Sequence, residues 1–223
     1  MAEGRHHPQP ASLLDRGKGK PGSWATTPAK RRRILDAALG CFDEKGMAAT
    51  TIDDICAIDL EANQLEGRGN APLERHLHCG IYRVRPDVRA IVHAHPKWST
   101  FLTMVGESYK PVYAQGALVH PVPLLDSPNS INNRAMADRL AATLGDRPAA
   151  LMKSHGAVTV GKDIVEAFVL ANYMEENSYR QYMALQIGKP YVFSDEEIAL
   201  CREKLWNAGL FKRTWDHFRA KLG

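Results

Sequence analysis

A short apolar run that ends in two histidines constrains this chain more than any other feature. Residues 89–95 are Arg-Ala-Ile-Val-His-Ala-His, a pattern typical of a buried strand. Side chains two residues apart on a strand point to the same face, so we expect His93 and His95 to lie side by side. Two such imidazoles can form half of a site for a zinc-like cation, or they can simply be buried and hydrogen-bonded.

Two further residues extend this pattern. His155 lies between two predicted strands, and Gly156 behind it allows a tight turn. Three neutral imidazoles can hold a metal ion and leave one coordination position open for a substrate, whereas a turn histidine needs no ion. Glu74 opens a predicted helix. Its carboxylate can have a purely local role, because the helix dipole favours a negative charge in the first turn. Near a metal site it can instead act as a general acid/base that is not a ligand.

The periodicity of the chain after residue 58 alternates between helix and strand, which predicts an α/β fold. Predicted strands or extended pieces lie at 89–95, 111–113, 122–125, 149–153 and 157–160. Predicted helices lie at 73–83, 99–105, 130–144, 163–186, 194–207 and 213–222.

Composition excludes several classes of protein. No apolar run approaches the roughly 20 residues of a membrane-spanning helix, and the first thirty residues have no apolar signal segment. The four cysteines are far apart and form no CxxC pair, which suits a reducing compartment. We therefore expect a cytoplasmic protein without a membrane partner.

The positive charge is concentrated at the N-terminus. Residues 1–33 hold eight Lys or Arg and two acidic residues, while the whole chain has 29 basic and 25 acidic residues. Residues 1–28 are rich in Pro, Gly, Lys and Ser, which predicts a disordered basic tail. Such a tail attracts phosphate only non-specifically, so we expect no specific nucleic-acid partner.

Several motifs together resemble the class II aldolase/adducin family over residues 58–223. They are Glu74 at the start of a helix, then Arg85-Pro86-Asp87, then His93-Ala94-His95, and later His155-Gly156. The resemblance implies a three-layer α/β/α fold around a mainly antiparallel sheet. It also implies a divalent ion on His93, His95 and His155, with zinc expected and manganese as the alternative, and Glu74 as acid/base. Its members are usually homotetramers that act on small molecules.

The same resemblance implies a metal-dependent carbon–carbon lyase, in which the ion stabilises an enolate. Sugar-phosphate aldolases of the family carry serines before the glutamate and an upstream GN(V/I)S segment. Here residues 70–73 are Asn-Ala-Pro-Leu, and that segment is absent. Residues 72–74, the 113–116 loop and the aromatic C-terminus (Phe211, Trp215, His217, Phe218) look more like the branch that decarboxylates hydroxylated aromatic or heteroaromatic carboxylates. Aldol cleavage or epimerisation of a sugar phosphate, and a non-catalytic adducin-like interaction module, are the alternatives.

Residues 29–57 do not fit this resemblance. Their sequence resembles the start of a TetR-type helix-turn-helix domain, but the recognition helix that would enter the DNA groove is missing. A DNA-binding regulator is therefore the least favoured interpretation. The segment is either a helical fusion, on a family domain that lacks its first strands, or a divergent N-terminus of that domain.

Overall fold

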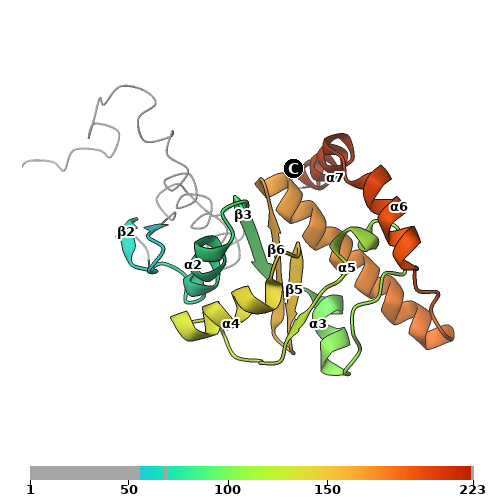
Figure 1. The fold of residues 1–223 in the computed structure, drawn as a ribbon, viewed down its shortest axis with the longest axis horizontal. Helices are drawn as coiled ribbons and strands as arrows, with labels where there is room; N and C mark the ends of the chain where they lie inside the picture. The colour runs from blue at the N-terminus through green and yellow to red at the C-terminus, as the bar shows by residue number, and fades with distance from the viewer. Residues whose placement is uncertain (1–55, 68–69, 222–223) are drawn as a thin grey trace, which may run out of the picture.

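The computed structural model describes residues 56–67 and 70–221 as helices around a small sheet (Figure 1). The predicted tail at 1–28 and nearly all of the 29–57 segment lie outside these residues. The strands are β1 (Ala57–Ile58), β2 (Gln64–Glu66), β3 (Ala90–Ala94), β4 (Leu124–Leu125), β5 (Ala149–Met152) and β6 (Gly156–Gly161). The helices are α2 (Arg75–Val84), α3 (Lys97–Met104), the 3-10 turn η3 (Gly116–Val119), α4 (Arg134–Leu144), α5 (Ile164–Ile187), α6 (Asp195–Leu205) and α7 (Ala208–Ala220).

The central sheet of the described residues has the strand order β3-β6-β5-β4. The β3–β6 and β6–β5 pairs are antiparallel and the β5–β4 pair is parallel, so the sheet is mixed with a mainly antiparallel pattern. In the pairing of β3 with β6, His93 lies opposite Val158. The α/β fold predicted from the sequence is confirmed.

Helices cover both faces of this sheet. On one face, α2 and α4 pack against side chains that alternate along the strands, such as Ile91, Met152 and Val158. On the other face, α5 covers Leu151 and Ala157. Figure 1 shows α2 and α4 on one side of the strands and the long α5 on the other. Because Ile91 and His93 are two residues apart, His93 emerges on the α2 side.

Side chains of α5 replace a strand partner for the segment 108–113. The sequence predicts an extended piece at 111–113, but no strand forms there. The buried Asn177 amide accepts hydrogen bonds from the N–H groups of Val112 and Tyr113 and donates one to the carbonyl of Lys110. Backbone groups that a neighbouring strand would bind are therefore bound by a helix side chain.

We expect Asn177→Ala to lower the free energy of unfolding by about 2–4 kcal/mol, because three backbone groups lose their partner. The matched control is Ser178→Ala. Ser178 is also buried, but within the part of the chain that the structure describes its hydroxyl binds only the Met174 carbonyl of its own helix. Urea unfolding followed by circular dichroism measures both variants, and equal losses would contradict this role for Asn177.

Helix ends differ from the predictions where capping side chains decide them. The helix predicted over 130–144 begins at Arg134, because the Asn133 side chain accepts the N–H of Met136. The helix predicted over 213–222 begins earlier, at Ala208, where Asn207 accepts the N–H of Leu210. No helix of the described residues is long and apolar enough to cross a bilayer.

Candidate metal centre

Three histidines meet where the strands β3 and β5 end. His93 is in β3, His95 follows its last residue, and His155 lies in the turn between β5 and β6. The imidazole centroids are 5.0 Å apart for His93 and His95, 4.9 Å for His95 and His155, and 5.6 Å for His93 and His155. The structure thus brings together the three histidines that the sequence predicts as ligands.

The Glu74 carboxylate lies among these rings, at the residue that precedes α2. Its Oε2 is 2.8 Å from Nε2 of His93 and 3.7 Å from Nε2 of His95, and its Oε1 is 3.3 Å from Nε2 of His155. Oε1 also accepts the N–H of Ile131, at 2.9 Å. Glu74 makes no side-chain cap of its own helix, so the purely local interpretation of this residue is not supported.

The outer nitrogens of two rings face backbone carbonyls. Nδ1 of His93 is 2.9 Å from the carbonyl oxygen of Ala157, and Nδ1 of His155 is 3.2 Å from that of Asn129. A neutral imidazole carries one N–H, and donation from Nδ1 leaves Nε2 as a lone-pair donor. Each of these two rings therefore has an oxygen atom near each of its nitrogens, and donation from Nδ1 to the carbonyl is compatible with a cation bound at Nε2.

The donor set fits a divalent cation. One ligand atom from each of the four residues lies within 4.8 Å of the others. Two nitrogens bound to one zinc ion are at most about 4.2 Å apart, so only a small contraction is needed. Neutral imidazole nitrogens suit zinc and can also bind manganese. The side chains of His93 and His155 are 7% and 8% exposed and that of His95 is 53% exposed, which leaves one side of the cluster open.

The same contacts shift the acidity of Glu74 and His155. Partial burial raises the pKa of Glu74, but the hydrogen bonds of His155 and His93, the His93 charge and the Ile131 N–H outweigh it, so the pKa lies far below its usual value. The hydrogen bond with Glu74 raises the pKa of His155 against the opposing effect of burial. Glu74 is therefore an anion in this arrangement.

Gly156 is required beside the cluster by close packing. A Cβ atom there would lie 2.5 Å from the Ala94 carbonyl oxygen and 2.8 Å from Cδ2 of His95. We expect Gly156→Ala to cost about 1–3 kcal/mol of stability and to displace the His95 ring. Gly188→Ala is the control, because a Cβ there meets no atom within 4 Å. Thermal unfolding and metal titration measure both; a Gly156→Ala protein that matches wild type in both would contradict this account.

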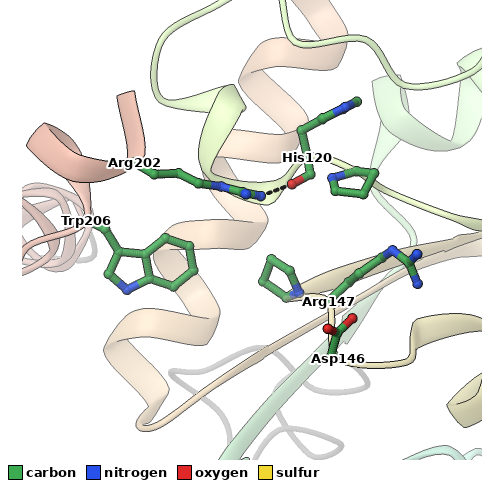
Figure 2. Close-up of a pocket in the computed structure, with 7 residues that line it drawn as sticks. His120, Asp146, Arg147, Arg202 and Trp206 are labelled. Carbon is green, nitrogen blue, oxygen red and sulfur yellow. Dashed lines mark hydrogen bonds between the residues drawn. The ribbon is translucent and has the colours of Figure 1, made fainter. Parts of the chain in front are cut away.

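A cavity lies apart from the histidine cluster, at the other end of β5. His120 lines a cavity of about 480 Å³ with Pro121, Asp146, Arg147, Pro148, Arg202 and Trp206 (Figure 2). This cavity adjoins the start of β5, whereas His155 follows the end of that strand. Arg202 donates a hydrogen bond to the His120 carbonyl. Burial and the Arg202 charge lower the pKa of His120, despite the opposing effect of Asp195.

The aromatic residues near the C-terminus pack on α5. Phe211 is buried against Tyr173, and Trp215 and Phe218 both contact Phe168 edge to face. None of them belongs to the histidine cluster.

A sheet of this topology, with three imidazoles and a carboxylate at the ends of its strands, defines the class of fold seen in class II aldolases. Residues 44–182 match the family described as "Class II Aldolase and Adducin N-terminal domain". This chain belongs to that family.

Both decarboxylases and aldolases are among the named relatives of this chain. The chain is 33% identical over 144 residues to a 3,4-dihydroxyphthalate decarboxylase of Arthrobacter keyseri, a match that covers 57% of this chain and 56% of the relative. It is 29% identical over 138 residues to an L-fuculose phosphate aldolase of Methanocaldococcus jannaschii, covering 61% of this chain and 74% of the relative. A solved L-fuculose 1-phosphate aldolase superposes with a TM-score of 0.66 at 26% identity, covering 71% of this chain and 75% of that one. The chain thus matches little more than half of the decarboxylase.

Proposed function

We propose that this chain is a metal-dependent carbon–carbon lyase that decarboxylates a hydroxylated aromatic or heteroaromatic carboxylate. The observation that carries the lyase assignment is the convergence of three Nε2 atoms on one carboxylate at an open strand end. His93, His95 and His155 would hold a divalent ion, zinc or manganese. Such an ion supplies a Lewis acid that stabilises negative charge as it develops on the substrate.

The protein's own groups give this site its geometry. The Ala157 and Asn129 carbonyls orient the His93 and His155 rings so that Nε2 faces inward. The Ile131 N–H orients the Glu74 carboxylate. Glu74, an anion in this arrangement, would accept and return a proton at Oε2, the atom that lies close to two of the rings.

The residue before Glu74 supports an aromatic rather than a phosphorylated substrate. Leu73, the residue before Glu74 in the sequence, is 63% exposed and therefore offers an apolar side chain to the surface near the start of α2. A phosphate group needs hydroxyl, N–H or cationic donors, whereas an aromatic ring gains from apolar contact. Residues 70–73 include no hydroxyl side chain.

The test is metal analysis of the purified protein followed by two product assays. We expect about one divalent ion per chain and carbon dioxide release from 3,4-dihydroxyphthalate or a related hydroxylated aromatic acid. The parallel assay measures aldehyde release from L-fuculose 1-phosphate. Aldehyde without carbon dioxide would reverse the choice of reaction, and the 29% identity to an aldolase makes that the second candidate. Protein that retains the ion but acts on neither class would favour an adducin-like interaction module.

The homotetramer and the cytoplasmic location also remain proposals. The exposed side of His95 leaves room for a neighbouring subunit or for substrate. Light scattering of the purified chain measures its oligomeric state directly.

A further inference from the structure

We propose that Glu175 of α5 is a positioning residue for the histidine cluster and that it acts through α3. This inference rests on the proposed function, because it concerns the imidazoles assigned there to the ion. Glu175 is not a member of the cluster. Its carboxylate instead binds the first turn of α3, which begins two residues after His95.

Three hydrogen bonds join Glu175 to this turn. Oε1 accepts the N–H of Trp98 at 2.6 Å, and Oε2 accepts both the N–H and the hydroxyl of Ser99 at 2.9 Å. The first N–H groups of a helix have no partner within it, and a negative charge there is favoured by the helix dipole. The residue before α3 is Pro96, which supplies no side-chain cap. The Glu175 carboxylate, from α5, therefore caps the first turn of α3 in place of a side chain at Pro96.

The last turn of α3 supports the His155 end of the cluster. The buried Thr103 hydroxyl accepts the N–H of Ser154 at 2.8 Å and donates to the Thr100 carbonyl at 2.7 Å. Ser154 has a φ of 53°, a left-handed conformation that is unfavourable for a residue with a side chain. The Thr103 contact helps to hold this strained residue, which directly precedes His155.

One helix thus links two of the three imidazoles. Its first turn follows His95 along the chain, and its last turn holds the residue before His155. Among the described residues Glu175 makes no ion pair, so its charge is balanced by the N–H and hydroxyl donors of α3. Loss of that charge should therefore move α3, and with it both rings.

Glu175→Gln removes this charge while keeping the size of the side chain. Glu176→Gln is a matched control at the next position, because Glu176 is exposed and pairs with Arg180 on the surface of α5. Full-length protein with ¹⁵N-labelled histidine and no added metal is compared by NMR at a temperature where circular dichroism shows intact folding. We expect Glu175→Gln to shift the imidazole signals of His95 and His155, which the corresponding alanine variants assign. Glu176→Gln should leave them unchanged.

A merely structural role would lower the unfolding temperature of Glu175→Gln and leave these signals at their wild-type positions. That result overturns the proposal. It does so whether or not the wild-type protein binds metal, so failure here differs from failure of the proposed function. If the signals shift but wild type binds no ion, the positioning role stands and the metal assignment falls.

Cobalt(II) titration of the metal-free protein supplies a second measurement. We expect Glu175→Gln to weaken cobalt binding about 10- to 100-fold, which is typical for residues that orient metal ligands. Thr103→Val should weaken it in the same direction, because valine keeps the shape but cannot accept the Ser154 N–H. Thr103→Ser keeps the hydroxyl and should restore binding. Equal cobalt affinity in Thr103→Val and Thr103→Ser would contradict the part assigned to α3.

Discussion

If the proposed function holds, replacement of His93 by alanine is expected to abolish metal binding and to lower turnover at least about 1000-fold, since the site loses its most enclosed proposed ligand. The His93 side chain is only 7% exposed, and its Nδ1 is fixed by the Ala157 carbonyl. No other described side chain reaches Glu74 at the same distance to take its place. Metal content by mass spectrometry and turnover on whichever substrate the two product assays identify give the two measurements.

The control for this variant is His76→Ala. His76 is a half-buried histidine of α2 outside the cluster, so its loss should alter neither metal content nor turnover. A His93→Ala protein that retains one ion per chain and normal turnover would exclude the three-histidine centre.

Glu74→Gln is expected to keep the metal but to lower turnover about 100- to 10,000-fold, the usual range for loss of a general acid/base. The amide keeps the shape of the side chain and can still accept the Ile131 N–H through its oxygen. It cannot take up a proton at the position that Oε2 now occupies. The measurements are metal affinity and turnover rate of the same preparation.

The outcome separates two roles for this carboxylate. If Glu74 were a metal ligand, Glu74→Gln would lose the ion together with activity, and the acid/base role would be wrong. Glu176→Gln, on the exposed side of α5, controls for the removal of one negative charge and should change neither quantity.

Local patterns predicted the main elements of the fold. The apolar run at 89–95 predicted strand β3, which spans Ala90–Ala94. The helical periodicity at 163–186 predicted helix α5, whose two ends each lie one residue later. These segments are long or strongly apolar, so their own sequence decides their type. The 111–113 segment is short, and its backbone partners come from Asn177, far away in the sequence. Such non-local partners leave no local signal.

For the candidate site, the sequence by itself determined which side chains can bind a cation. The two-residue spacing of His93 and His95 follows from strand geometry, and the glycine after His155 marks a tight turn. Only the tertiary structure decided that Glu74 faces these rings and that the Asn129 and Ala157 carbonyls fix their nitrogens. It also decided that Glu175 caps α3. A side-chain type and its neighbours are local properties, but backbone carbonyls and N–H groups are present at every residue, so their partners are chosen only when distant segments pack together.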